Sequence, residues 1–77
     1  GDCILIRYGQ PQAPRVMVID GGTQDSGDAL VRLLRGLTGE AVPVVHELLV
    51  SHPDADHASG ALAILEATAV ERVHVQV

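Results

Sequence analysis

The sequence predicts one α/β domain, spanning residues 1–77, whose elements follow the order β-β-α-β-α-β. Three observations lead to this prediction. Four short runs rich in Val, Ile and Leu have the length of strands, and two longer segments carry apolar residues at helical spacing. Turn-forming residues separate these segments, and neither a repeat nor a linker divides the chain. We therefore expect a single layered domain with a mixed sheet.

The first two strands are expected to be antiparallel neighbours. Residues 3–8 read Cys-Ile-Leu-Ile-Arg-Tyr, a short run with strand character. Residues 9–14 are rich in Gly and Pro, which predicts a hairpin loop. The second strand covers residues 16–19, and its continuous apolar run indicates burial on both faces. The residues Asp20-Gly21-Gly22 end it.

A helix follows, with Asp25 or Ser26 as its N-cap and Gly39 as the residue that closes it. Five apolar residues form its predicted buried stripe: Ala29, Leu30, Leu33, Leu34 and Leu37. Residues 44–50 form the third strand. Because a helix of crossover length precedes this strand, we expect it to pair in parallel with the second strand.

A second helix is expected to begin between Asp56 and Ser59 and to end near Thr68. Three of its apolar residues share one helical face: Leu62, Leu65 and Ala69. Within this helix, Gly60 allows either close packing of the backbone or the approach of a substrate. Residues 72–77 form the fourth strand.

The composition indicates an incomplete core. The only aromatic residue is Tyr8. The fold must therefore depend on buried aliphatic side chains, each of which contributes about 1.5–3 kcal/mol of stability, without large aromatic areas. A single cysteine, Cys3, excludes an internal disulfide and is interpreted as a small buried hydrophobe. The chain starts at Gly1 and ends within the fourth predicted strand. We expect it to be a fragment of a larger domain, packed on the remainder of that domain or on a partner chain.

The charge balance disfavours nucleic-acid binding by this segment alone. Ten acidic residues outweigh five arginines, lysine is absent, and the net charge is −5. Recognition of nucleic-acid phosphates depends on a basic patch, which this composition does not provide. The apolar runs are also far shorter than the roughly 18 residues that a membrane-spanning helix requires.

A cluster of imidazole and carboxylate side chains follows the third strand. Residues 51–57 read Ser-His-Pro-Asp-Ala-Asp-His. In an extended segment, His52 and Asp54 point to the same side with backbones about 6.5–7 Å apart, which suits one ligand pair. A turn into the second helix brings Asp56 and His57 together as a second pair. Two ions held in this way favour metal-assisted hydrolysis, with Asp56 as the candidate catalytic residue that also orients the attacking water.

Helix capping is the alternative interpretation of the loop, with Asp54 or Asp56 accepting backbone N–H groups. Four ligand-type side chains in six positions exceed what capping needs, so the metal interpretation is favoured. Asp20 either accepts a hydrogen bond from a ligand histidine or only shapes a turn. His46 and His74 are interpreted as surface or hydrogen-bonded sheet residues, not as ligands.

Together these motifs resemble the metallo-β-lactamase superfamily, whose signature is His-x-His-x-Asp-His after a strand, with an earlier strand ending in Asp-Gly. The matching residues here are His52, Asp54, Asp56, His57, Asp20 and Gly21. The chain is more similar to the ComEC-like hydrolase branch. The three motifs that carry this likeness are Gly1-Asp2-Cys3, Ile19-Asp20-Gly21-Gly22, and residues 51–57 with Gly60.

The resemblance implies the N-terminal part of an αββα sandwich. It also implies that His52 and Asp54 hold one metal ion, that Asp56 and His57 hold a second, and that Asp20 supports these ligands. The family's later histidine, bridging aspartate and last histidine have no counterpart here, so this segment alone is expected to be inactive. Asp54 stands where the family more commonly has histidine, which shifts the expected preference from zinc toward manganese or magnesium.

The expected function is therefore that of a metal-dependent hydrolase with two divalent ions, Zn or Mn. A manganese-dependent nuclease or phosphodiesterase is favoured, with nucleic acid or a nucleotide as substrate. Hydrolysis of another ester, a thioester, a lactone or a lactam on the same fold is one alternative. A non-catalytic piece that folds on a partner is the other. The sequence does not determine the cellular location, and a cytoplasmic location is expected only for a stand-alone hydrolase.

Overall fold

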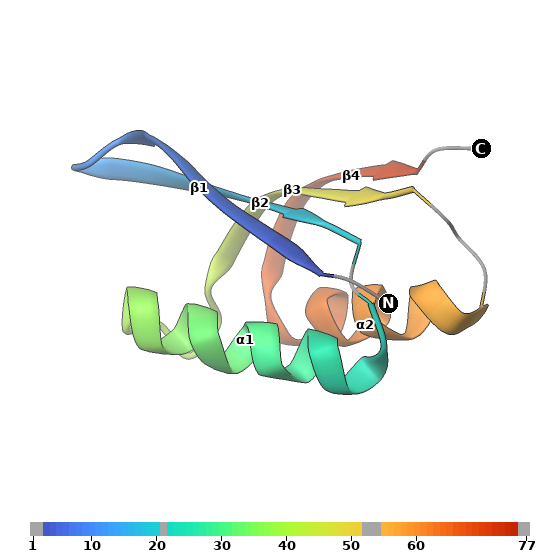
Figure 1. Ribbon diagram of the computed structural model, residues 1–77. Coiled ribbons are helices and arrows are strands. Elements are labelled where there is room, and N and C mark those ends of the chain that lie inside the picture. Colours follow the sequence, from blue (N-terminus) through green and yellow to red (C-terminus); the bar gives the residue numbers. More distant parts are fainter. Residues whose placement is uncertain (1–2, 21, 52–54, 76–77) are drawn as a thin grey trace.

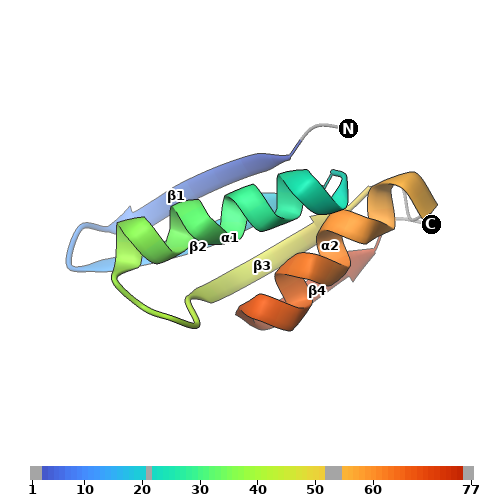
Figure 2. The same ribbon diagram turned by 90° about the horizontal axis from the view of Figure 1, so that it is seen from below.

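The computed structural model describes residues 3–20, 22–51 and 55–75, and for residues 55–58 it describes the backbone alone. The elements within these residues are β1 (Ile4–Gln10), β2 (Ala13–Ile19), α1 (Gln24–Thr38), β3 (Val44–Val50), α2 (Ala55–Ala67) and β4 (Ala69–Val75). Both helices lie on the same face of the sheet (Figures 1 and 2). The predicted α/β class and element order are confirmed.

The sheet is mixed, with strand order β1-β2-β3-β4. As predicted, β1 and β2 are antiparallel, and β2 pairs in parallel with β3. The strands β3 and β4 are also parallel. Because parallel strands end at the same edge of a sheet, the carboxyl ends of β2, β3 and β4 lie together, and this edge is where such sheets bind ligands.

The β1–β2 hairpin is longer than predicted. The register pairs Gly9 with Pro14 and Gln10 with Ala13, so the loop is residues 11–12 and not 9–14. Pro14 is tolerated inside β2 because the pairing of β2 with β3 covers only residues 17–19. The strand β4 also begins earlier than predicted, at Ala69, where pairing with Val44 of β3 recruits it into the sheet.

The N-cap of α1 is Thr23, so the prediction of Asp25 or Ser26 is wrong. The Thr23 residue has an extended backbone, and its Oγ1 accepts a hydrogen bond from the Ser26 backbone N–H at 3.2 Å. Asp25 instead lies in the first turn, where its charge is favourable. The predicted end at Gly39 is confirmed, because this residue has a φ of 72° and donates its N–H to the Arg35 carbonyl.

The buried stripe of α1 differs from the predicted one. Leu33 and Leu37 are 52% and 47% exposed, although both belonged to the predicted stripe. The residues that α1 buries are Gly27, Leu30, Val31 and Leu34. This rotation has a tertiary cause, because α1 packs against α2 as well as against the sheet, which turns the side carrying Gly27 and Val31 inward.

The second helix shows the same kind of difference. It begins at Ala55, earlier than predicted, and ends at Ala67. Leu62 and Leu65 are 57% and 40% exposed, whereas Ala61 and Ile64 are buried. The predicted apolar face of α2 is therefore not the face that packs on the rest of the domain.

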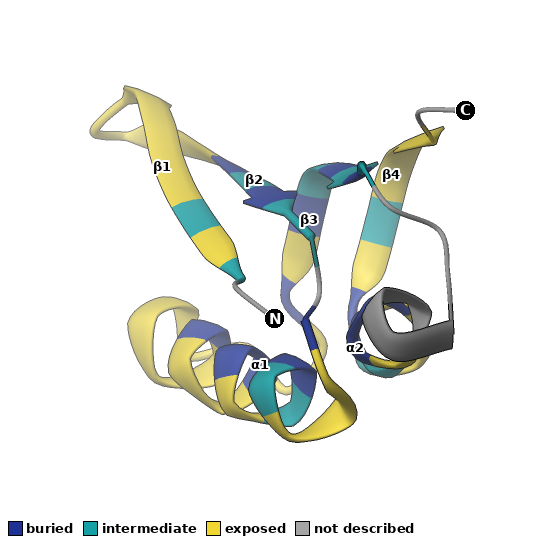
Figure 3. Cartoon of the chain, turned by 45° about the vertical axis from the view of Figure 1, so that its right-hand side comes forward, coloured by how far each residue is buried: buried dark blue, intermediate teal, exposed yellow. Residues whose placement is uncertain are grey.

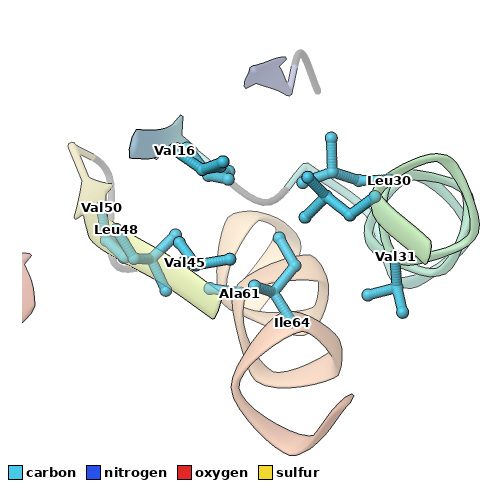
Figure 4. Close-up of a cluster of buried hydrophobic side chains, with 10 residues drawn as sticks. Val16, Leu30, Val31, Val45, Leu48, Val50, Ala61 and Ile64 are labelled. Atoms are coloured by element: carbon cyan, nitrogen blue, oxygen red, sulfur yellow. The ribbon is translucent and has the colours of Figure 1, made fainter. Parts of the chain in front are cut away.

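The core lies between the helices and the inner face of the sheet (Figures 3 and 4). Its ten buried hydrophobic residues are Val16, Val18, Leu30, Val31, Leu34, Val45, Leu48, Val50, Ala61 and Ile64. They come from β2, β3, α1 and α2, whereas β1 contributes only the partly buried Leu5. Each fully buried aliphatic side chain contributes about 1.5–3 kcal/mol relative to an exposed one.

The outer face of the sheet carries a second set of apolar residues. Side chains alternate along a strand, so Met17 and Ile19 lie opposite the buried Val16 and Val18. Their antiparallel partners Ile6 and Ile4 share this outer face, and they are 38% and 49% exposed. Within the described residues, no helix covers this face (Figure 1).

Polar contacts lie beside this apolar patch. The Tyr8 hydroxyl donates to Glu47 Oε2 at 3.0 Å, and His74 Nε2 lies 3.4 Å from Glu47 Oε1. The hydrogen bond from Tyr8 is the largest cause of a lowered Glu47 pKa, and the adjacent His74 adds to it. His46 Nδ1 accepts the Val16 backbone N–H at 2.9 Å, where β2 separates from β3. The interpretation of His46 as a hydrogen-bonded sheet residue is confirmed.

Gly27 and Gly36 form a matched pair in α1 for testing the helix contact. A Cβ atom built on Gly27 would lie 2.5 Å from the carbonyl oxygen of Gly60 and 2.9 Å from its Cα, so α2 would have to move. We expect Gly27→Ala to lower the free energy of unfolding by about 1–3 kcal/mol. Gly36 has open space around it, so Gly36→Ala should raise stability by about 0.5–1 kcal/mol. Urea unfolding measures both, and equal effects of the two substitutions would contradict the close contact.

The Tyr8–Glu47 hydrogen bond predicts a pH effect. Since the Glu47 pKa is lower in the folded chain, the carboxylate stabilises the fold above its ordinary pKa, and this contribution is lost as the pH falls through the lowered value. Tyr8→Phe removes the donor, so the Glu47 pKa should rise toward its ordinary value. An NMR titration of the Glu47 carboxyl carbon measures this change. A titration curve identical to that of the wild type would show that the bond does not form in solution.

Candidate functional site

The carboxyl ends of β2 and β3 are joined through Asp20. Its backbone N–H donates to the Leu49 carbonyl at 2.7 Å. Its Oδ1 accepts the Ser51 backbone N–H at 2.8 Å. The Ser51 hydroxyl lies 2.8 Å from Oδ1 and 2.7 Å from Oδ2, so it also donates to this carboxylate. Asp20 therefore contacts the residue that directly precedes His52.

The backbone of Asp20 is strained. Its φ is 56°, and within the described residues it is the only residue other than glycine with a positive φ. Such a conformation costs on the order of 1 kcal/mol or more for a residue with a Cβ atom, although aspartate tolerates it better than most residues. The hydrogen bonds to Leu49 and Ser51 offset this cost. The conformation turns the chain sharply from β2 into the loop before α1.

A second contact links the same loop to α2. The Gly60 backbone N–H donates to the Gly22 carbonyl at 3.1 Å. Gly60 also packs directly on Gly27, where a side chain on Gly27 would overlap its backbone. Of the two roles considered for Gly60, close packing of the backbone is confirmed.

The four predicted metal ligands fall largely outside the described residues. His52 and Asp54 lie in the segment 52–54, which the structure does not describe. Asp56 and His57 lie in the first turn of α2, where the backbone is described and the side chains are not. Among the described side chains, no three His, Cys, Asp or Glu residues are grouped closely enough to hold a metal ion. The ligand assignment therefore stays a prediction from the sequence.

Cys3 lies near this edge and has a thiol that is difficult to ionise. Partial burial is the larger cause of its raised pKa, and the negative charge of Asp20 is the smaller one. The residue packs against the hydrophobic core. A raised pKa disfavours the thiolate that a nucleophile or a metal ligand requires, which agrees with the interpretation of Cys3 as a small hydrophobe.

A groove of about 470 Å³ lies between the two helices, with Asp28, Arg35, Ala63 and Glu66 among the residues that line it. Neither Asp20 nor Ser51 contributes to its lining, so we do not assign the chemistry to this groove. Ser51 is the residue that sequence reasoning missed. Its position in the sequence could have identified it, because it directly follows the third strand and precedes the first candidate ligand.

Comparison with known protein families identifies the family of this chain. The family model described as the metallo-beta-lactamase superfamily matches residues 1–77. The chain belongs to the metallo-β-lactamase superfamily. Its element order and mixed four-stranded sheet are consistent with the start of the metallo-β-lactamase fold. A search of curated proteins and a search of solved structures both found no match.

Membership in the metallo-β-lactamase superfamily indicates a metal-dependent hydrolase, since members of this superfamily are mostly hydrolases and typically bind divalent metals. The edge of the sheet that holds Asp20 and Ser51 is the edge from which the His52–His57 signature begins. Within the described residues, no helix is long and apolar enough to cross a membrane.

The proximity of Cys3 and Asp20 predicts a measurable coupling. Asp20→Asn removes the negative charge and keeps an oxygen acceptor, so the Cys3 pKa should fall. It should stay above the ordinary cysteine value, because burial is the larger cause of the shift. The pH dependence of alkylation by iodoacetamide measures the Cys3 pKa. Asp25→Asn, in the exposed first turn of α1, is the control and should leave the profile unchanged.

Proposed function

We propose that this chain contributes four ligands to a dinuclear metal site at the carboxyl edge of the sheet and that the site hydrolyses a phosphodiester. The proposed ligands are His52, Asp54, Asp56 and His57. One observation carries the proposal: the Asp20 carboxylate is hydrogen-bonded to Ser51, the residue before His52, at 2.8 Å from its N–H. This contact supports the proposed role of Asp20, which is to hold the ligand segment from the neighbouring strand.

The donor chemistry of the segment suits divalent ions. Two imidazoles and two carboxylates are ordinary ligands of zinc and manganese, and this chain places them within six positions. When bound, two such ions supply Lewis acidity and lower the pKa of a water molecule. The role proposed for Asp56 is to ligate an ion and to orient the attacking water.

The preference for a phosphodiester rests on Asp54 and on the motifs shared with the ComEC-like branch. An aspartate at this position makes the ligand set richer in oxygen, which favours manganese or magnesium over zinc. Nucleic acid or a nucleotide is the proposed substrate. The net charge of −5 means that the basic groups that bind its phosphates must come from outside these 77 residues.

The outer face of the sheet supports a proposal about the partner. Ile4 and Ile6 on β1 are 49% and 38% exposed, and they align with Ile19 and Met17 on β2. An apolar sheet face of this kind is stable in water only when another layer covers it. We infer that the remainder of the same domain covers this face, as the sandwich architecture of the superfamily requires.

Metal titration tests the proposed function. Manganese or zinc should bind the protein and raise its free energy of unfolding by about 2.7 kcal/mol at a metal concentration one hundred times the dissociation constant. The chelator EDTA should reverse this gain. In the complete domain, of which these residues are the proposed N-terminal portion, we expect His52→Ala to weaken metal binding at least tenfold and to abolish the hydrolysis of bis(p-nitrophenyl) phosphate.

His74→Ala is the matched control, because this β4 histidine is exposed and lies beside Glu47 of β3. It should leave metal affinity and hydrolysis unchanged. The proposed function is wrong if calorimetry detects no tight binding of either ion and His52→Ala hydrolyses the phosphodiester as fast as the wild type.

A further inference from the structure

The two helices form the surface of the molecule on one side of the sheet, with a groove between them. They meet where Gly27 packs on Gly60 and diverge from this contact toward their C-terminal ends (Figure 2). The groove of about 470 Å³ lies between them, and a second hollow of about 350 Å³ shares three lining residues with it. We propose that this helical surface is a self-association site, which a second copy of the same chain covers across a two-fold axis.

The lining of the groove combines small residues with an apolar ridge. Ala63 and Ala67 of α2 line it and are partly buried. Leu62, which also lines it, is 57% exposed, and Leu65, three positions later, is 40% exposed. Small side chains let another helix approach closely, and the exposed leucines leave water when it does. Within the described residues, no other element covers this surface (Figure 2).

The charges around the groove are balanced, unlike those of the chain as a whole. Two acids, Asp28 and Glu66, and two arginines, Arg32 and Arg35, line the groove and the adjoining hollow. The other charged residues therefore carry the entire net charge of −5. Two copies of an acidic chain repel each other through this excess charge, and the balanced helical surface is where that repulsion is weakest.

The charges also lie where a two-fold contact can pair them. Both helices run in the same direction, because each follows one strand of a parallel pair and leads into the next. Arg32 of α1 lies five positions after Gly27. Glu66 of α2 lies six positions after Gly60. The two side chains are thus about 7.5 and 9 Å along their helices from the contact that joins α1 to α2.

A two-fold axis parallel to the helices places α1 of one copy on α2 of the other. Such an isologous contact uses the same surface twice, so that surface must contain both members of each pair. Arg32 of each copy then meets Glu66 of the other, which gives two equivalent ion pairs. Within the described residues of one copy, both side chains are exposed and neither forms a hydrogen bond or an ion pair.

Other occupants fit this surface less well. Nucleic acid requires an excess of positive charge, which the balanced groove does not have. A small-molecule site needs polar groups that orient the ligand in a pocket. Among the described residues, the only buried polar side chain is that of Thr68, whose hydroxyl already donates to the Ile64 carbonyl at 2.6 Å. The outer face of the sheet is the face that we assign to the remainder of the domain, so the helices stay available to a second copy.

An exchange of the two charges tests the pairing in the complete domain. Sedimentation equilibrium should show that the wild type forms a dimer, which high salt weakens. Arg32→Glu places two acids opposite each other, and Glu66→Arg places two arginines opposite each other, so each variant should dimerise at least tenfold more weakly. An equimolar mixture of the two variants should form a heterodimer with about the wild-type affinity, because each copy supplies the charge that the other needs.

Two matched controls separate this contact from general effects of charge and apolarity. Glu40→Arg changes the net charge as Glu66→Arg does, but Glu40 lines neither hollow, so the dimer should be unchanged. Leu62→Ala should weaken the dimer about tenfold. Val42→Ala should not, because Val42 is 61% exposed and lies outside the groove.

The outcomes decide the inference without reference to metal. A wild type that stays monomeric at its highest soluble concentration overturns it. A dimer that neither charge exchange weakens overturns it as well, and so do variants that fail to associate when they are mixed. Recovery of the dimer in the mixture alone supports it. Because none of these measurements involves metal binding, the calorimetry described above decides the proposed function separately.

Discussion

The Asp20 carboxylate joins the ends of two parallel strands, and much of the arrangement at this edge depends on that contact. Its hydrogen bonds to Ser51 hold the exit of β3 beside the exit of β2. The positive φ of Asp20 then directs the chain toward Thr23, which caps α1. Gly27 of α1 then packs on the backbone of Gly60, and this contact places α2 beside α1. The cost of one strained residue is offset by contacts that position two helices.

The two faces of the sheet have different roles in stability. The inner face buries Val18 and Leu48 completely against the helices, where Leu34 and Ile64 are also inaccessible to solvent. The outer face carries Ile4 and other apolar side chains that are only partly covered, together with the polar contacts around Glu47. A small domain with one aromatic residue gains little stability from such a face until another layer covers it. The same sheet thus carries the Asp20–Ser51 contact at its edge and a partly exposed apolar layer on its outer face.

Much of this architecture was predictable from local patterns. The element order, the antiparallel and parallel pairings and the end of α1 at Gly39 follow from apolar periodicity, crossover length and turn chemistry. The superfamily resemblance follows from the His52–His57 signature and from the strand that ends in Asp20-Gly21, and the family model matches residues 1–77. The four ligands are predictions from that signature. In the described structure, Asp20 contacts Ser51, the residue that precedes the first of these ligands.

The sequence by itself determined which segments become strands and helices, because backbone propensity, capping and apolar spacing act within a few residues. Only the tertiary structure decided which helix faces are buried, since Leu33, Leu37 and Leu62 are as apolar as the residues that pack inward. It also decided that Ser51 is the partner of Asp20 and that Gly60 lies against Gly27. These contacts join residues about thirty positions apart, and no local pattern encodes a contact that exists only once the sheet and helices have come together.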